Sequence, residues 1–387
     1  MSREQMPPLA DLKVLEFAGI GPAPFAVMWL AQMGASVIRI ERPGASALAL
    51  DPARDPLLRG RQAVLRLDLK DDAARAALWP LVENTDVLIE GFRPGVMEKM
   101  GLGPDAVHAR NPRLVYARLT GWGQNGPRAR EAGHDITYIA LSGALAAIGP
   151  KDGPPAIPLN LIGDFAAGAF YCLAGILAAL YARERTDRGT VVDAAMVDGV
   201  AHLMTIVFGM ANMGLWRAMR ESNLIDGGAP FYSVYETKDG RWLAVGCLEP
   251  PFYAEFLRIA GLADEPVCRR QYDPASWPDM RAAIAARIRQ KTRDEWEALF
   301  AGTDACVAPV KDYTEMADDP HLAARGVITD TPLGPLPAPA PRFAPDPVPP
   351  PEKASWTSAA DRPTDPPSPW GLDQENWQAL TQLSKQG

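Results

Sequence analysis

The N-terminal half of the chain alternates between short apolar runs and longer stretches with helical periodicity. Runs rich in Val, Ile and Leu predict buried strands at residues 13–19, 36–41, 63–69, 86–92, 114–120 and 190–196. Segments between them, such as 24–34 and 71–85, have the spacing of helices. Because strands and helices alternate, we predict an α/β fold with a Rossmann-like parallel sheet that helices cover on both faces.

A long apolar stretch, residues 165–182, has the length of a membrane-spanning helix. It is rich in Ala and Gly, follows Asp164 directly, and ends at the charged residues 183–185. A second apolar stretch follows at 199–216. This pattern favours buried helices in a soluble protein, and we expect no membrane partner.

The C-terminal half predicts a smaller α+β domain. Residues 231–247 have the pattern of a hairpin with the turn Thr-Lys-Asp-Gly. Helical patterns follow at 251–260, 276–289 and 292–301. A Met-rich helix at 196–219 precedes the hairpin, and it is either core filler or a flexible apolar wall for varied acyl chains. The Pro-rich stretch 331–370 is expected to wrap over the surface or to remain mobile.

Charge and cysteine content narrow the class of protein. With 47 acidic and 39 basic side chains the formal net charge is −8, so nothing favours non-specific nucleic-acid or membrane binding. The four cysteines lie far apart without metal-ligand spacing, which indicates free thiols in a reducing compartment. The first 13 residues contain no apolar signal segment, and we expect a cytoplasmic protein without a metal or redox cofactor.

The turn after the first predicted strand, AGIGPAP, invites comparison with a dinucleotide-binding loop. It contains Gly19 and Gly21, but Pro22 and Pro24 follow where the fingerprint requires a third glycine. A tight turn is therefore the better interpretation.

Three polar residues stand beside apolar segments, where burial of a polar side chain would cost free energy. Asp164 precedes an apolar helix, His134 stands at a helix start, and Glu249 precedes a Pro-Pro helix start. Each has a structural explanation, since caps and acidic residues favour helix N-termini. Asp164 and His134 also have a chemical one, because a carboxylate in dry surroundings and an imidazole both exchange protons with a ligand.

The three residues occur in the order AGHDITYIALSG, PLNLIGDFAAG and GCLEPPFY, and with these motifs the chain resembles the α-methylacyl-CoA racemases of the family III CoA-transferase superfamily. The resemblance runs from about residue 9 to residue 328. Other stretches that carry it are GASVIRIERPG, LRLDLK, VLIEGFRPGVMEKMGLGP, ARLTGWGQNGP, RGTVVDAAMVDG, DGGAPFYSVYET and DACVAPV.

The resemblance implies an isomerase that removes the α-proton of a 2-methylacyl-CoA and returns a proton to either face of the enolate. The two proton carriers fall on His134 and Asp164, and Glu249 supports the protonated histidine. The backbone N–H of Asp135 faces the thioester oxygen, so that this residue matters more for its backbone position than for its carboxylate.

The resemblance also implies where coenzyme A binds. Arg39, Lys70, Arg93 and Lys99 match CoA-contacting positions, and Leu67 borders the adenine. Taken singly, each basic residue is an ordinary solvated surface charge. The CoA moiety is part of the substrate, so no separate cofactor is expected.

Relatives are interlocked homodimers, and this architecture defines the expected domains. These are a large Rossmann-like CoA-binding domain (1–195), linker helices (196–225), a small α+β domain (226–325) and a C-terminal segment that returns to the large domain with a Pro-rich tail (326–387). Glu249 would then reach His134 across the subunit boundary. Residues 46–62 and the Pro-rich tail match no motif, and the sequence does not identify the acyl group.

Two alternatives remain. A CoA transferase of the same superfamily would use Asp164 as a nucleophile, through an acyl anhydride and an aspartyl-CoA thioester. A non-catalytic acyl-CoA binder would require neither proton carrier. His134 and Glu249 favour the racemase, because a transferase needs no second proton carrier opposite the aspartate.

Overall fold

The computed structural model describes residues 7–44, 54–343, 366–367 and 369–386. The chain forms two compact units. Of the described residues, the large unit comprises those up to 142, 159–203 and those from 339 onward, and the small unit comprises 143–158 and 204–338. These bounds differ from the expected ones, because residues 143–158 and 326–338 belong to the small unit and 196–203 stay with the large one.

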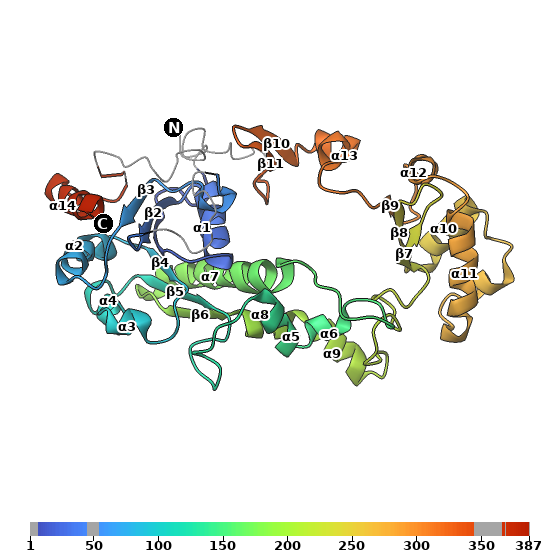
Figure 1. Cartoon of the computed structure of the whole chain (residues 1–387), viewed down its shortest axis with the longest axis horizontal. Helices are drawn as coiled ribbons and strands as arrows, with labels where there is room; N and C mark the ends of the chain where they lie inside the picture. Colours follow the sequence, from blue (N-terminus) through green and yellow to red (C-terminus); the bar gives the residue numbers. More distant parts are fainter. Residues whose placement is uncertain (1–6, 45–53, 344–365, 368, 387) are drawn as a thin grey trace. The chain divides into compact units, whose positions relative to one another are not determined.

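The large unit contains a six-stranded parallel sheet with the strand order β3-β2-β1-β4-β5-β6 (Figure 1). Its strands are β1 (Lys13–Phe17), β2 (Ser36–Glu41), β3 (Ala63–Arg66), β4 (Val87–Glu90), β5 (Val115–Thr120) and β6 (Val191–Ala195). All six predicted strands are present, and the expected parallel α/β sheet is confirmed. The order reverses between β1 and β4, and the carboxyl ends of the strands beside such a reversal are the usual ligand-binding position in open parallel sheets.

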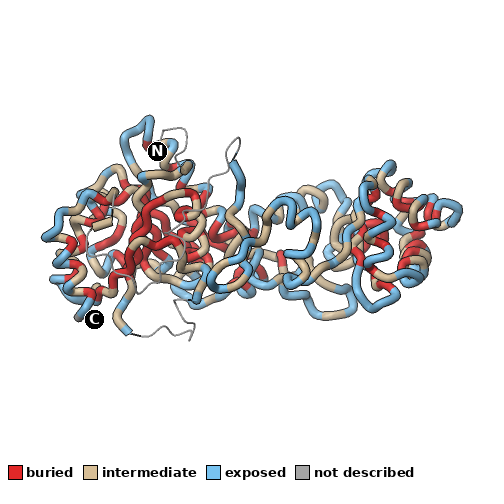
Figure 2. Tube along the Cα trace, turned by 90° about the horizontal axis from the view of Figure 1, so that it is seen from above, coloured by how far each residue is buried: buried red, intermediate tan, exposed pale blue. Residues whose placement is uncertain are grey.

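Helices cover both faces of this sheet, because each strand is apolar on both sides. On β1, Val14 belongs to one buried cluster, whereas Leu15 and Phe17 belong to the other. The first cluster includes residues of α1 (Pro22–Gln32) and α7 (Tyr171–Thr186), and the second includes α2 (Asp72–Glu83), α4 (Pro104–Arg110) and α14 (Gln374–Gln386). Figure 2 shows the buried residues concentrated in the interior of the chain's compact parts, with exposed residues around them.

The C-terminal helix α14 is part of the large unit's core. Trp370 and Trp377 are completely buried. The Trp370 indole donates a hydrogen bond to Ser36 Oγ at 2.7 Å, and the Arg66 N–H donates to Ser384 Oγ at 2.8 Å. These contacts fix the C-terminus against β2 and β3, although residues 344–365 of the Pro-rich stretch lie outside the described part of the chain.

The apolar stretch expected at 165–182 forms a longer, composite helix. Its first part is a π-helix, η3 (Leu161–Phe170), and its second part is α7. Together, Leu161–Thr186 form a 26-residue segment in which an 18-residue window has mean hydropathy 1.8, and within the described residues this is the one helix long and apolar enough to cross a membrane. Its buried face packs on β5 and β6 of the sheet (Figure 1), as a core helix does.

The small unit has a three-stranded antiparallel sheet made of β7 (Tyr232–Glu236), β8 (Trp242–Gly246) and β9 (Val307–Pro309). Its first two strands form the hairpin predicted from 231–247. Helices α10 (Pro250–Ala260), α11 (Trp277–Ile288) and α12 (Arg293–Phe300) match the three predicted helical segments and bury their apolar faces in one cluster with the sheet.

The predicted single Met-rich helix over 196–219 is wrong, because two short helices meet near Met204 and the second ends at Asn212. The first, α8 (Met196–Leu203), packs against η3, and the second, α9 (Thr205–Asn212), has no buried residue. The remaining elements are α3 (Val96–Lys99), α5 (Asp135–Leu141), α6 (Ala144–Ala147), α13 (Pro320–Ala324), the hairpin β10 (Ile328–Thr331) with β11 (Gly334–Pro337), and four short helical turns, η2 (Pro56–Leu58), η4 (Pro266–Arg269), η5 (Pro274–Ser276) and η6 (Met316–Asp318).

Candidate active site

The turn between β1 and α1 makes room for a carboxylate at the carboxyl edge of the sheet. Gly21 is the N-cap of α1, with φ +67°. A Cβ at this position would lie 3.1 Å from Oδ2 of Asp164. The turn is therefore tight, as predicted, and its glycine allows η3 to bring the Asp164 side chain close to the backbone.

His134 is the N-cap of α5, and its backbone is extended. The His134 N–H donates to Thr137 Oγ1 at 3.0 Å, and the Thr137 hydroxyl donates to the His134 carbonyl at 2.7 Å. Thr137 thus satisfies backbone groups at the helix start, while His134 itself is exposed. His134 is therefore at a helix start, as the structural explanation expected, and it is also exposed to solvent.

Asp164 lies inside the first turn of η3 and is half-buried. The N-cap of η3 is Asn160, so the N-cap explanation for Asp164 is wrong: the helix begins four residues earlier than the apolar pattern indicated. Asn160 Nδ2 donates to Asp164 Oδ2 at 3.2 Å. We did not select Asn160 from the sequence. Its position four residues before Asp164 could have indicated the contact, because side chains at this spacing are neighbours at the start of a helix.

Burial raises the pKa of the Asp164 carboxyl above its ordinary value. The negative charge of Asp135 raises this pKa further, whereas the Asn160 hydrogen bond and the charge of His134 lower it. Because His134 and Asp135 both act on this carboxyl, the structure brings three of the sequence-predicted site residues together.

The Asp135 carboxylate is buried, with the residue 5% exposed. Its Oδ2 accepts a hydrogen bond from the Asp164 N–H at 2.7 Å, and its Oδ1 has no hydrogen-bond partner among the described residues. From the sequence we expected a role mainly for the backbone of this residue. The signal that was missed is Gly163, since a Cβ there would lie 2.6 Å from the same Oδ2.

Glu249 belongs to the small unit, where it is the exposed N-cap of α10. Burial raises the pKa of the Cys306 thiol, and the nearby charge of Glu249 contributes to the increase. Cys306 is free, as are the other three cysteines, in agreement with the sequence. The contact between Glu249 and His134 stays a prediction.

Arg39, a predicted CoA ligand, is buried in an ion-pair network. Its guanidinium contacts Glu16 Oε1 at 2.5 Å and Glu41 Oε1 at 2.8 Å, and Arg61 contacts Glu16 Oε2 at 2.9 Å. Burial opposes the charge of Arg39, but the two carboxylates outweigh it and raise the pKa of this guanidinium. Arg61 also donates to the Pro24 carbonyl at 3.0 Å, so the network braces the β1–α1 turn.

The other predicted CoA contacts follow the carboxyl ends of β3 and β4. Leu67 is buried directly after β3, whereas Lys70, Arg93 and Lys99 are exposed. None of these three basic side chains forms an ion pair with another described residue, and at this edge they suit an anionic ligand.

A second buried network, not recognised from the sequence, holds α3 against the sheet. Arg118 donates to Glu90 Oε1 at 3.0 Å and to Glu98 Oε1 at 2.8 Å. Glu90 is completely buried, and this burial raises its pKa to about 7 despite the opposing Phe92 N–H and Arg118. Because α3 ends at Lys99, the network fixes the position of that lysine.

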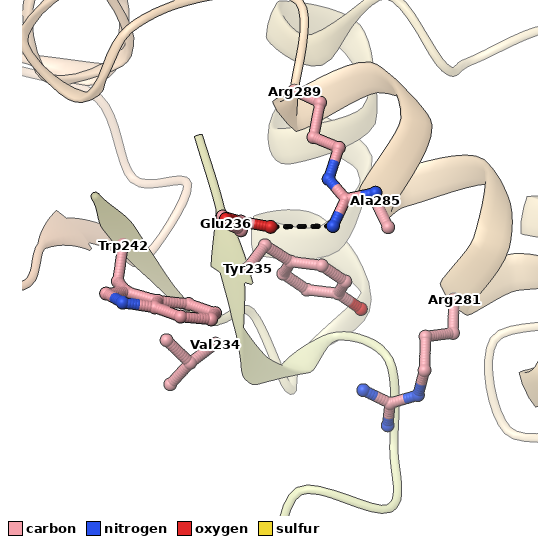
Figure 3. Close-up of a pocket in the computed structure, with 7 residues that line it drawn as sticks. All are labelled: Val234, Tyr235, Glu236, Trp242, Arg281, Ala285 and Arg289. Carbon is pink, nitrogen blue, oxygen red and sulfur yellow. Dashed lines mark hydrogen bonds and ion pairs between the residues drawn. The ribbon is translucent and has the colours of Figure 1, made fainter. Parts of the chain in front are cut away.

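The cavities described in the small unit contain no sequence-predicted site residue. The larger, of about 880 Å³, is lined by residues that include Glu221, Tyr232, Trp242 and Cys306. The smaller, of about 200 Å³, is drawn in Figure 3, where Arg289 pairs with Glu236 and Arg281 lies apart from them. Arg281 donates to two backbone carbonyls and to a serine hydroxyl, so its guanidinium serves the fold.

Comparison with known proteins agrees with this arrangement. The family model for CoA-transferase family III matches residues 9–365. The human and mouse alpha-methylacyl-CoA racemases are each 44% identical to this chain over 334 residues, which cover 86% of this chain and 86% of each relative. The crystal structure of a CaiB/BaiF family protein from Brucella suis matches with a TM-score of 0.74 and 25% identity, covering 98% of this chain and 100% of that one. The resemblance inferred from the sequence is confirmed, and the chain belongs to CoA-transferase family III.

Proposed function

We propose that this protein is an isomerase that racemises 2-methylacyl-CoA thioesters by proton transfer through an enolate. The observation that carries the proposal is the 2.7 Å hydrogen bond from the Asp164 N–H to Asp135 Oδ2, which brings Asp164 beside the start of α5, where His134 is the N-cap. The 44% identity to alpha-methylacyl-CoA racemases supports the same reaction.

Racemisation needs one group that removes the α-proton and another that returns a proton to the opposite face. An imidazole is a base near neutral pH, and the raised pKa of Asp164 increases its protonated fraction at a given pH. In our proposal His134 is the base and Asp164 the acid for one hand of the substrate. The roles are exchanged for the other hand.

The enolate oxygen needs a hydrogen-bond donor, because negative charge develops on it. We propose the backbone N–H of Asp135, at the first position of α5, for this role. N–H groups in the first turn of a helix have no partner within the helix, and the positive end of the helix dipole adds to their effect.

Binding of the CoA moiety is assigned to the carboxyl edge of the large unit's sheet. Lys70, Arg93 and Lys99 would meet the phosphates, and Leu67 the adenine. The guanidinium of Arg39 already contacts the carboxylates of Glu16 and Glu41. We therefore expect Arg39 to contribute less to the binding of CoA than Lys70, Arg93 and Lys99. The substrate carries the CoA, and no separate cofactor is proposed.

We further propose a homodimer in the cytoplasm, in which Glu249 of one chain supports His134 of the other. Helix α9 and the residues that follow it expose Ile206, Phe208, Met213 and Leu215, each about 60% exposed. Exposed apolar residues that cluster along one segment are typical of a protein interface.

Family III CoA transferases provide the second candidate function, in which Asp164 attacks the thioester as a nucleophile. That reaction consumes an acceptor acid and gives a new thioester. Racemisation requires no acceptor, so the two functions are distinguished by what must be added to the reaction.

The decisive experiment incubates the protein with a 2-methylacyl-CoA in heavy water without any acceptor acid. We expect deuterium at the α-carbon and loss of optical purity. His134→Ala and Asp164→Asn should each slow the exchange by about 10²- to 10⁴-fold, the usual contribution of a general acid or base.

Matched controls are His321→Ala and Asp152→Asn, which change exposed residues outside the site and should leave exchange unchanged. A wild-type protein that exchanges nothing, but transfers CoA once a carboxylic acid is added, would establish the transferase instead. Binding without either reaction would indicate an acyl-CoA binder.

A further inference from the structure

The carboxylate of Asp135 is unusual because it is buried and only half satisfied. One oxygen accepts the Asp164 N–H at 2.7 Å, the other has no hydrogen-bond partner in the part of the chain that the structure describes, and the residue is 5% exposed. A buried charge with so few partners is costly unless it performs a task that a neutral residue cannot.

The Asp164 N–H is a group that needs a partner. It lies in the first turn of η3, where N–H groups have no acceptor within the helix. Asn160, the N-cap, makes no capping hydrogen bond with its side chain. The Asp135 carboxylate therefore takes the place of the missing cap, although it comes from a different helix.

This hydrogen bond links the two proposed proton carriers. His134 is joined to Asp135 by a peptide bond, and Asp135 holds the backbone of Asp164. Gly163 allows the close approach, since any side chain there would meet the carboxylate. The spacing of imidazole and carboxyl is thus set by one side chain in addition to the packing of α5 on η3.

Charge adds a second effect. The groups that act on the Asp164 carboxyl are His134 and Asp135 at the start of α5 and Asn160 on η3 itself, while the β1–α1 turn presents the uncharged Gly21. Tyr138 on α5 is also near enough for the Asp164 charge to raise its pKa, after the larger effect of burial. Asp135 is the one negative neighbour in this described set, and it favours a proton on Asp164.

We propose that the Asp135 carboxylate is a positioning residue for the proton-transfer reaction: it caps η3 at Asp164, fixes that residue against His134 and places negative charge beside it. The proposal rests on the proposed racemase function. It assigns to this side chain a role separate from that of its own backbone N–H.

Two variants separate position from charge. Asp135→Asn keeps a carbonyl oxygen for the Asp164 N–H but removes the charge, whereas Asp135→Ala removes both. Exchange kinetics in heavy water against pH, with a 2-methylacyl-CoA as substrate, and hydrogen–deuterium exchange of the peptide that covers η3 are measured for wild type and both variants.

In Asp135→Ala we expect kcat to fall by about 10²-fold, as misplacement of a reacting group does, with KM within about threefold of wild type. The η3 peptide should exchange its amides faster. Asp135→Asn should restore most of the amide protection and part of kcat. Its acid limb of kcat/KM should move to lower pH, because without the neighbouring negative charge Asp164 loses its proton more easily.

The pH dependence of exchange and the amide protection of η3 can each contradict the proposal. An unchanged acid limb in Asp135→Asn would exclude the effect of charge, and unchanged kcat and amide protection in Asp135→Ala would exclude the cap. If wild-type protein does not exchange the α-proton, the racemase function fails, and the amide protection of η3 still decides whether Asp135 caps this helix.

Discussion

At position 163 the chain has no room for a side chain, although the residue is not in a left-handed conformation. The restriction comes from Asp135, whose Oδ2 would lie 2.6 Å from an added Cβ. Gly163 directly precedes Asp164, so a change at this position acts on the proposed proton carrier without altering its chemistry. The residue thus tests whether the geometry of the site, and not merely its composition, is required.

We predict that Gly163→Ala lowers kcat for α-proton exchange by 10-fold or more, on the order of the loss that small displacements of reacting groups cause. The new methyl group would push Asp135 from the Asp164 N–H. The matched control is Gly246→Ala on β8, where an added Cβ meets other atoms only at 3.7 Å or more. Equal kcat in both variants would show that the Asp135–Asp164 contact is not needed for turnover.

At the scale of elements, the buried pair of Glu90 on β4 and Arg118 on β5 makes the stability of the folded state depend on pH. Arg118 also binds Glu98 of α3, so the pair belongs to the contacts that attach α3 to the sheet. Burial raises the pKa of Glu90 from 4.5 to about 7. The folded state therefore binds this proton more tightly than the unfolded state does. The associated stability is fully present below pH 4.5 and is lost as pH rises through 7.

Glu90→Gln removes this titration. Between pH 5 and pH 8 we expect the stability of the variant to improve relative to wild type by about 2–3 kcal/mol, the free energy of a shift of this size. Chemical unfolding at both pH values measures the difference, and Glu375→Gln, a change at an exposed position of α14, is the control. The assignment fails if the offset between Glu90→Gln and wild type is the same at both pH values.

For the whole molecule, the division into two units bears on how the site is completed. His134 and Asp164 belong to the large unit, whereas Glu249 belongs to the small unit. If Glu249 acts on His134 of the partner chain, neither chain alone contains a complete site. The homodimer would then be a requirement of catalysis as well as of stability.

Mixing inactive His134→Ala and Glu249→Ala proteins under conditions of subunit exchange tests this directly. Half of the dimers would be mixed, and each would hold one site with an intact histidine and an intact glutamate. We expect exchange activity of about a quarter of wild type. No recovery, with mixed dimers demonstrated by mass spectrometry, would place the two residues of a working site in one chain.

The sequence by itself determined the strands of the sheet, the hairpin of the small unit and most helices. Their signals are local: apolar runs of strand length, helical periodicity, and a Thr-Lys-Asp-Gly turn. Local signals failed where neighbouring segments decide the outcome. The Met-rich segment breaks near Met204, and the apolar helix begins at Leu161 as a π-helix, neither of which the periodicity indicates.

The site residues were found by their motifs, but only the tertiary structure decided what their side chains touch. Asp135 and Asp164 are 29 residues apart and meet because α5 packs on η3. Arg39 has the sequence context of a ligand contact, yet the pairing of β1 with β2 places it against Glu16. Periodicity records which face of an element is apolar. Which polar groups meet depends on strand order and on the close approach of distant elements, and these are properties of the folded chain as a whole.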